Sequence, residues 1–418
     1  MDKTLKIVSF LYPLLILCMF STLVGYWMPM KDKMPYIVMA FAVAIVFFDA
    51  RFFASKSFGW FAAYAAIVCL NFAFGKKYFI DRYSFNSLLN LASVFVIMMG
   101  LAHYSLVEKN RGEHALYRNT FIIIFLIISI ATICTAILNA ENPGILRSYM
   151  HTEEDYVNVY FSLGLSNYSL PHAVPIIIPA IVCAIRNSQS KPAFKFCMWI
   201  LLALCFYLII LSGATTPLLL AALVLIMSFT VNKSGGKKNK YIGWIIILIP
   251  FILFPEILNS VLGFFVDVFA SNETTEDFST HLQDIISSNE AGESTGDVAA
   301  RSELYWQTII EFIKSPIWGS NGNLGGHSAI LDRVAALGII GIIPLYFMIK
   351  SQYQMFSSTL DMGYFAYYKL GVLAAVLMLL SKNMFNTELF LMLFVGLPFM
   401  LLYQQESVAP NNNARTSN

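Results

Sequence analysis

The sequence predicts an all-α, polytopic membrane protein with about twelve transmembrane helices, and three observations carry that prediction. Hydrophobic residues make up 58% of the 418 residues. Charged residues make up only 12%, about half of the roughly 25% found in soluble globular proteins. Apolar runs such as FIIIFLIISIATICTAIL (121–138) recur along the chain, and they match the thickness of the lipid core of a bilayer. A chain of this composition cannot cover a surface that faces water.

The individual spans follow from these apolar stretches. A transmembrane helix needs about 20 mostly apolar residues, within a range of about 17–25. The stretches that approach or meet this length are 7–30, 34–49, 57–75, 85–106, 119–140, 169–186, 194–212, 214–231, 241–259, 329–349, 364–381 and 386–403. The first of them exceeds the core of a signal peptide, which has about 7–15 apolar residues. We therefore expect it to be a membrane helix rather than a cleaved leader.

The Lys and Arg residues of the connections predict the orientation, because cytoplasmic loops carry an excess of them. With the N-terminus inside, the inner connections hold sixteen Lys and Arg residues and the outer ones only nine, although the outer ones are longer. NKSGGKKNK at 232–240 is the most basic connection. Both termini are therefore expected in the cytoplasm. The net charge of +2 gives no reason to expect a nucleic-acid partner.

This orientation divides the chain into four parts. Residues 1–259 hold the first nine helices and an outer loop at 141–168. A large outer loop at 260–328 precedes the last three helices, at 329–403. Residues 404–418 form a cytoplasmic tail that we expect to be disordered. Most of the extramembrane mass thus lies outside, late in the chain.

The large outer loop changes character along its length. Residues 271–300 hold seven acidic residues and no Lys or Arg, which predicts a solvated, partly disordered segment. RSELYWQTIIEFIK (301–314) follows, with apolar residues at helical spacing on one broad face. Acidic residues near its start and Lys314 at its end suit the helix dipole. We expect a short helix that lies on the outer membrane–water interface.

The chemistry-bearing stretch is SPIWGSNGNLGGHSAILDR (315–333), between that helix and the tenth span. Its four glycines, Gly322 among them, allow a ligand to approach the main chain closely. His327 stands just before the next helix, with Ser328 as the expected N-cap. These residues also have plain structural interpretations. The glycines can form a flexible connector, and His327 can be a helix cap or an interface residue.

Charged residues complete the candidate site. Asp332 and Arg333 lie about one turn into the tenth span, where charges are costly and usually face a polar cavity. Arg301 opens the interfacial helix. Two cations, an imidazole and a carboxylate around pliant backbone suit an anionic, lipid-linked substrate rather than a metal, and no HExxH, DxD or His-rich spacing is present. The plain alternative is that Asp332 and Arg333 satisfy other buried groups.

The run R-S-E-L-Y-W-(x)9-P-I-W-G-S-N-G-(x)4-H-S-A-I-L-D-(x)5-G-I-I-G resembles the signature of the O-antigen polymerase and O-antigen ligase superfamily. That signature has an arginine, an aromatic residue, spaced Pro and Gly, His-Asn or His-Ser, and a Gly-Ile-x-Gly helix. The specific match covers about 301–341, whereas the twelve-span layout with its largest outer loop before a late span covers the whole chain. The resemblance implies a GT-C-like membrane glycosyltransferase. Its donor would be an undecaprenyl-diphosphate-linked oligosaccharide, and it would need neither a metal nor another cofactor.

The resemblance also assigns roles to residues. Arg301 would bind the diphosphate, because guanidinium groups stabilise the negative charge that develops on such a leaving group. His327 would serve the acceptor hydroxyl or the leaving group, because imidazole titrates in the useful pH range. In-line displacement would invert the anomeric configuration. The further substrate-binding candidates are Gly322, Ser328, Asp332 and Arg333, together with Arg147 and Tyr168 of the first outer loop.

One departure from the family pattern bears on these roles. Thr215 and Thr216 stand where the family often has a second arginine. Arg147 is the candidate replacement. Tyr168, in the same outer loop, is apt for stacking on a sugar, although an aromatic belt at the membrane interface accounts for it equally well.

Three functions remain open at this stage. The first is a polymerase that joins lipid-linked repeat units in lipopolysaccharide or other surface-polysaccharide biosynthesis. The second is a ligase that transfers the finished glycan to lipid A-core. The third, of another class, is a polysaccharide transporter or flippase, although the two halves show no similarity of the kind seen in many transporters. We expect a multi-pass protein of the bacterial inner membrane whose site faces the periplasm among membrane lipid, with a chain-length regulator protein as a candidate partner.

Overall fold

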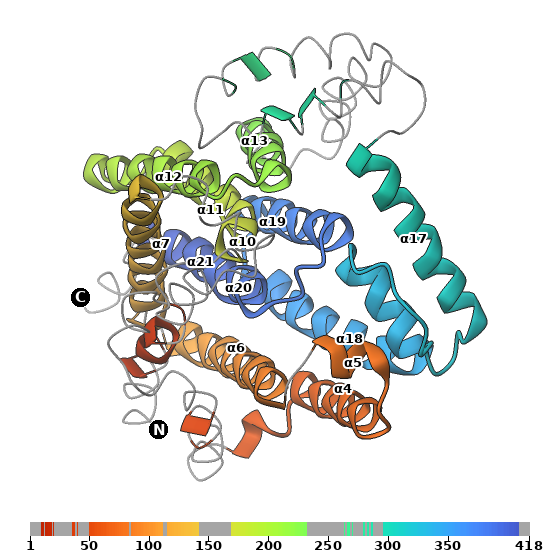
Figure 1. Cartoon of the computed structure of the whole chain (residues 1–418). Coiled ribbons are helices and arrows are strands. Elements are labelled where there is room, and N and C mark those ends of the chain that lie inside the picture. The colour runs from red at the N-terminus through yellow and green to blue at the C-terminus, as the bar shows by residue number, and fades with distance from the viewer. Residues whose placement is uncertain are drawn as a thin grey trace.

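The computed structural model describes residues 50–82, 85–111, 115–141, 169–231 and 296–408, together with short helical pieces between 10 and 40 and between 263 and 286. All regular secondary structure in these residues is helical, as Figure 1 shows. The predicted span at 241–259, most of those at 7–30 and 34–49, most of the loop at 141–168, most of the acidic segment and the end of the tail lie outside the described residues.

The helices follow the predicted order. Their bounds are η2 Ala50–Phe52, α4 Lys56–Ala73, α5 Lys77–Arg82, α6 Phe85–Arg111, α7 Ala115–Glu141, α10 Ser169–Ala173, η3 Val174–Ile176, α11 Ile178–Arg186, α12 Pro192–Leu211, α13 Thr215–Thr230, α17 Gly296–Lys314, α18 Ala329–Thr359, α19 Met362–Ser381, α20 Thr387–Leu391, η4 Met392–Gly396 and α21 Leu397–Val408. Each predicted span that falls within the described residues coincides with a helix or a chain of helices.

The described residues contain six helices that are long and apolar enough to cross a membrane, or seven if the bent pair of α10 and α11 is one span. Two apolar helices, Leu91–Ser105 within α6 and Thr215–Thr230, are shorter. The all-helical class and the transmembrane character are therefore confirmed. The total of twelve spans stays a prediction, because several of the predicted spans lie outside the described residues.

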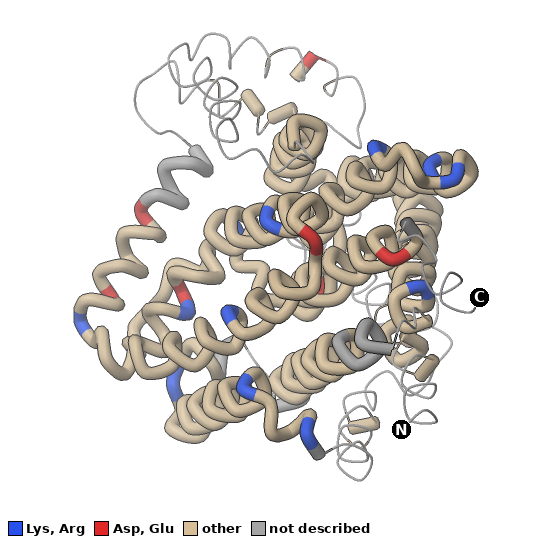
Figure 2. The backbone as a smooth tube through the Cα atoms, turned by 180° about the vertical axis from the view of Figure 1, so that it is seen from behind, with Lys and Arg blue, Asp and Glu red and all other residues tan. Residues whose placement is uncertain are grey.

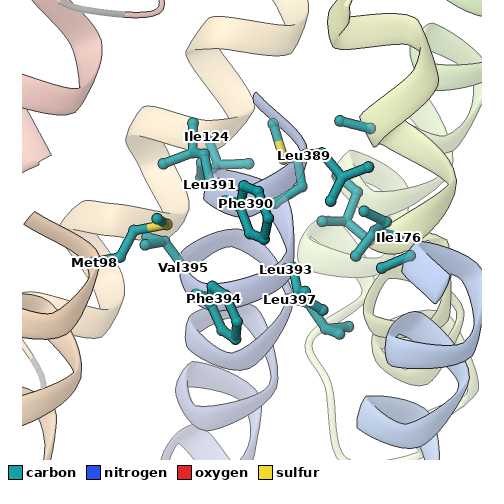
Figure 3. Packing of buried hydrophobic residues seen from close by; sticks show 14 of the residues in the cluster. Met98, Ile124, Ile176, Leu389, Phe390, Leu391, Leu393, Phe394, Val395 and Leu397 are labelled. Atoms are coloured by element: carbon teal, nitrogen blue, oxygen red, sulfur yellow. The ribbon is translucent and has the colours of Figure 1, made fainter. Parts of the chain in front are cut away.

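The last span, formed by α20, η4 and α21, lies at the centre of the bundle. Of its most apolar window 83% is buried, against 22 to 44% for the other long spans. Figure 3 shows Phe390 and Phe394 of this span among Met98 of α6, Ile124 of α7 and Ile176 of η3. The two phenylalanine rings stack, with centroids 6.0 Å apart. Helices from both halves of the chain therefore pack against this last span.

The span at 169–186 is bent rather than straight. α10 and η3 meet α11 at an angle of 42°. Pro175 and Pro179 remove backbone donors at this point, which accounts for the bend. α19 crosses η3 very closely, because a side-chain carbon at Gly371 would lie 2.5 Å from the carbonyl oxygen of Ile176. A small residue is therefore required at that helix contact, as in many membrane bundles.

α18 is broken within its apolar part. Gly338 has φ of 60° and ψ of −171°, which interrupts the helix that the GIIG sequence predicts to be continuous. The amide of Ile339 donates to the carbonyl of Pro316 at 2.8 Å. The amide of Ile340 donates to the carbonyl of Ile317 at 3.3 Å. The turn after α17 thus supplies partners for backbone groups that the break frees, as irregular backbone at membrane depth requires.

The other side of the break is satisfied in the same way. The amide of Ser320 donates to the carbonyl of Ala335 at 2.7 Å. The ammonium of Lys76, between α4 and α5, donates to the carbonyls of Gly319 and Ala336, both at 3.2 Å. Partial burial lowers the pKa of Lys76 below its ordinary value. Lys76, which is distant in the sequence, therefore links α18 to the turn after α17 by hydrogen bonds to both segments.

α17 runs along the edge of the bundle beside α18, as Figure 1 shows. Its inner face carries Thr308, which is 1% exposed. Its outer face carries Trp306, Ile310 and Ile313, which are 63, 51 and 67% exposed, and Trp318 follows in the next turn at 67%. The predicted helix at 301–314 is confirmed and begins earlier, at residue 296. Its exposed apolar face is what an interfacial or lipid-facing helix would present; its depth in a membrane stays a prediction.

Charged residues are sparse along the described helices, which Figure 2 shows as mostly tan tube. The guanidinium of Arg186, at the end of α11, donates to the carbonyls of Ser228 and Val231 at 3.0 and 2.7 Å and to the hydroxyl of Tyr367 at 3.1 Å. It thereby satisfies the terminal carbonyls of α13, as a cation at a helix C-terminus does.

Candidate functional site

The glycine segment, residues 319–326, is anchored on α17 by Glu311. The carboxylate of Glu311 accepts a hydrogen bond from the hydroxyl of Ser320 and pairs with Lys314 at 2.5 Å. These hydrogen bonds, from Lys314 first and Ser320 second, lower the pKa of Glu311. The hydroxyl of Ser320 also accepts from the amide of Gly322 at 2.9 Å. A side-chain carbon at Gly322 would overlap the Glu311 carboxylate, so a larger residue there would displace that carboxylate from its hydrogen bond with Ser320.

A second anchor joins the glycine segment to α18. The amide of Gly325 donates to the hydroxyl of Thr308 at 2.9 Å. The amide of Gly326 donates to Oδ1 of Asp332 at 3.2 Å, and the Thr308 hydroxyl lies 3.3 Å from the same oxygen. Asp332 is 1% exposed and sits in the first turn of its helix, where the dipole favours a negative charge. Its carboxylate therefore holds the glycine segment against both helices.

These contacts give His327 a fixed backbone. On one side its neighbour Gly326 is tied to Asp332, and on the other Ser328 caps α18 by accepting from the amide of Leu331 at 3.3 Å. The amide of Ala329 donates to the carbonyl of Lys382 at 3.1 Å, which joins the start of α18 to the end of α19. The predicted cap at Ser328 is confirmed. The backbone that carries the half-buried imidazole of His327 is thus held in place near the meeting point of α17, α18 and α19.

Arg333 contacts a different set of elements from its neighbour Asp332. Its guanidinium is 2% exposed, donates to the hydroxyl of Tyr64 in α4 at 3.1 Å, and lies 3.4 Å from the ring centroid of Phe385. Stacking over an aromatic face lowers the cost of burying such a charge. The sequence predicted a polar cavity around this arginine. The cavity that it lines is instead apolar, because the rest of the wall comes from hydrophobic residues of α4 and α6.

The cavity between α4 and α6 has a volume of about 480 Å³. Its described lining residues are Phe61, Tyr64, Ala65, Val68, Cys69, Phe72, Ala73, Leu88, Leu89, Leu91, Ala92, Phe95 and Arg333. Only the last of these carries a charge. The site of a small ligand typically has a volume of roughly 300–1,000 Å³ and is mostly apolar with a few polar groups. This cavity has that character.

The predicted site residues therefore fall into three groups. Gly322, His327, Ser328 and Asp332 come together where α17 meets α18. Arg333 lies on the adjoining α4–α6 cavity. The other three are placed less fully. Arg301 belongs to the early turns of α17, and its side chain lies outside the described part, as do Arg147 and Tyr168 entirely. Their contacts with substrate stay predictions.

Sequence reasoning missed several residues that build this region. Tyr64 and Phe385 hold Arg333, and Lys76 holds the break in α18, yet each comes from a distant part of the chain. Thr308 offered a local signal, since a hydroxyl on the inner face of an amphipathic helix needs a partner. Glu311 offered another, because it lies three residues before Lys314 on the same helix.

The family pattern also pointed to Thr215. It opens α13, directly after a turn that contains Gly213 with φ of 63°. The role that a second arginine would play at this position stays a prediction.

The fold and the site together define a class: an all-helical protein of membrane-spanning type, with a broken helix and an anchored glycine segment beside an arginine-lined apolar cavity. No protein-family model matches the chain, and no curated protein is found to be similar to it.

Proposed function

We propose that the chain is a polymerase that joins undecaprenyl-diphosphate-linked oligosaccharide repeat units into a longer surface polysaccharide such as O-antigen. In this proposal the protein crosses the bacterial inner membrane about twelve times, and the glycine segment faces the periplasm. The repeat units arrive on membrane lipid, and a chain-length regulator is a candidate protein partner. The reaction needs no metal or other cofactor in this scheme.

The proposed step is an inverting glycosyl transfer. The hydroxyl of the acceptor sugar attacks the anomeric carbon of the donor, and the bond from that carbon to the diphosphate oxygen breaks. His327 takes the proton of the attacking hydroxyl, which general-base catalysis by imidazole makes faster by typically 10²–10⁴-fold. Arg301 stabilises the negative charge that develops on the departing diphosphate. The products are the extended glycan and undecaprenyl diphosphate.

One observation carries the proposal more than any other. Hydrogen bonds fix the backbone on both sides of His327: the amides of Gly325 and Gly326 donate to Thr308 and Asp332, and the hydroxyl of Ser328 accepts from the amide of Leu331. A flexible connector would not need such a network. A catalytic imidazole does need a fixed backbone, because small displacements of a reacting group are costly.

In vitro polymerisation tests the proposal. Purified protein in lipid nanodiscs would receive lipid-linked repeat units as the only glycan, and the products would be separated by chain length. We expect a ladder of products with the wild type and a rate at least about 10²-fold lower for His327→Ala, the loss expected when a general base is removed. Arg301→Ala should also lower the rate, with little change in folding.

His103→Ala is the matched control, because this half-buried histidine lies on α6 beside Phe52 and Tyr104, outside the candidate site. It should keep the wild-type ladder. If His327→Ala polymerises at the wild-type rate, the assigned chemistry is wrong.

The same assay separates the alternatives. A ligase makes no ladder from repeat units alone and forms product only when lipid A-core is added. A transporter leaves polymerisation untouched and moves repeat units across the membrane, so its loss would trap them on the cytoplasmic side of cells. In cells that carry His327→Ala, repeat units that reach the outer leaflet but are not extended into long glycan chains would exclude transport as the function of this residue.

A further inference from the structure

The α4–α6 cavity has a chemical character of its own. Twelve of its described lining residues are uncharged and mostly hydrophobic, and a buried guanidinium stands among them. An apolar cavity of this size suits the aliphatic chain of a lipid. A buried cation beside it attracts an anionic headgroup, and guanidinium is especially suited to phosphate.

The position of the cavity adds a second constraint. Arg333 belongs to the first turns of α18, only six residues beyond His327, while its guanidinium is held by Tyr64 and Phe385 at the cavity wall. A lipid whose chain lay between α4 and α6 would therefore carry its phosphate groups at the start of α18. His327 directly precedes Ser328, the N-cap of the same helix, so the reacting end of that lipid would lie near the backbone that carries the imidazole.

We infer that the α4–α6 cavity binds the head-proximal part of the isoprenoid chain of the lipid-linked substrate, with Arg333 directed to its diphosphate. This inference rests on the proposed function and adds a binding site to it. The volume of about 480 Å³ accommodates only part of an undecaprenyl chain, so the remainder lies in the bilayer. The charge of Arg333 selects isoprenoid diphosphates over neutral polyprenols.

Cys69 gives a direct probe of occupancy, because it lines the cavity and its side chain is exposed. In a variant that keeps only this cysteine of the six, maleimide labelling in nanodiscs would be followed with time. Undecaprenyl diphosphate at ten times its dissociation constant should slow labelling about tenfold, since about one site in eleven stays empty. Phosphatidylglycerol at the same mole fraction should have little effect.

Two results would overturn the inference. One is a labelling rate that undecaprenyl diphosphate does not change. The other is equal protection by phosphatidylglycerol, which would make the cavity a site for ordinary bilayer lipid. Undecaprenol, which lacks phosphate, should protect Cys69 less than the diphosphate does when Arg333 is present. Arg333→Gln should remove that difference, and persistence of the difference would refute the role given to the arginine.

Chain-length dependence provides a second, catalytic readout. Ala65→Trp places a bulky side chain in the cavity, whereas Ala66→Trp places the same side chain on an exposed position of α4 outside it. We expect wild type and Ala66→Trp to prefer long-chain over short-chain isoprenoid donors. Ala65→Trp should lose that preference while still using the short-chain donor. An unchanged preference in Ala65→Trp would contradict the assignment.

The two proposals fail in different ways. If no donor is polymerised but undecaprenyl diphosphate still protects Cys69, the proposed reaction is wrong and the lipid site stands. If repeat units are polymerised but neither protection nor chain-length preference depends on the cavity, the reaction stands and the site is wrong.

Discussion

Asp332 and Arg333 are adjacent charged residues whose side chains have separate tasks. The carboxylate accepts hydrogen bonds from the glycine segment and Thr308, whereas the guanidinium lines the α4–α6 cavity. The sequence predicts both as substrate-binding residues. The contacts described here give Asp332 a positioning role, and its predicted contact with substrate stays a prediction.

Removing the Asp332 carboxylate should loosen the glycine segment. Asp332→Ala leaves the Gly326 amide without this acceptor, whereas the Thr308 hydroxyl keeps the Leu304 carbonyl at 3.0 Å; the loss costs about 1–3 kcal/mol in the free energy of unfolding. Asp332→Asn should cost less, because it keeps the oxygen. Chemical unfolding in detergent micelles would measure both.

Thr308→Val gives the test of the shared network. Its effect and that of Asp332→Ala should not add in the double variant, because the two residues share one hydrogen bond. Strictly additive effects would show that the two side chains act independently.

Glu311 should make the stability of this region sensitive to acid. Hydrogen bonds from Lys314 and Ser320 lower its pKa, so the folded state binds this proton more weakly than the unfolded state does. The stabilisation is therefore full above the ordinary Glu pKa of about 4.3 and is lost as the pH falls through the lowered value. The thermal midpoint of wild type should then fall more steeply below about pH 4 than that of Glu311→Gln. Parallel pH profiles would exclude this coupling.

Single residues were predictable where their partners are local. Ser328 was predicted as a cap because it directly precedes an apolar helix, and Leu331, its partner, lies three residues on. The contact of Arg333 with Tyr64 joins residues that are 269 positions apart. No spacing rule reports such a pair, since only packing of the whole bundle brings α4 to α18.

At the scale of elements, apolar length predicted where the helices lie but not where they break. The stretch at 329–349 reads as one continuous span, and α18 indeed continues to Thr359. The break at Gly338 is stable only because the turn at 315–320 and Lys76 satisfy the freed backbone groups. A helix-forming sequence can thus take an interrupted form when another segment supplies hydrogen bonds.

Gly338→Ala should disrupt this arrangement. The combination of φ at 60° and ψ at −171°, which is essentially restricted to glycine, costs a residue with a side chain about 1–3 kcal/mol, and the added carbon would also collide with the carbonyl of Ile317. We expect a loss of at least about 2 kcal/mol in the free energy of unfolding and a displaced turn after α17.

Gly59→Ala is the matched control, because it lies within α4 with open space around the added carbon. It should be neutral or stabilising, by up to about 1 kcal/mol. Equal destabilisation by the two substitutions would mean that the break is not what makes Gly338 necessary.

At the scale of the whole molecule, composition predicted the class, and the long-range arrangement required the structure. The sequence indicates an all-helical membrane protein, and the described helices confirm that class. It does not indicate that the last span lies at the centre, with 83% of its apolar window buried, because its composition resembles that of its neighbours. The burial of a span depends on which helices surround it, and hydropathy does not predict those neighbours.

The orientation of the molecule is the prediction on which the proposed reaction depends most. An excess of Lys and Arg in alternate connections places the glycine segment outside and the α11–α12 connection inside. Asn323 is exposed in the glycine segment, and Gln189 is exposed in that connection. In a cysteine-free background, a membrane-impermeant maleimide should label Asn323→Cys from the periplasmic side of spheroplasts. It should label Gln189→Cys only after the membrane is permeabilised. The reverse pattern would place His327 on the cytoplasmic leaflet, away from the exported repeat units, and the polymerase proposal would then be wrong.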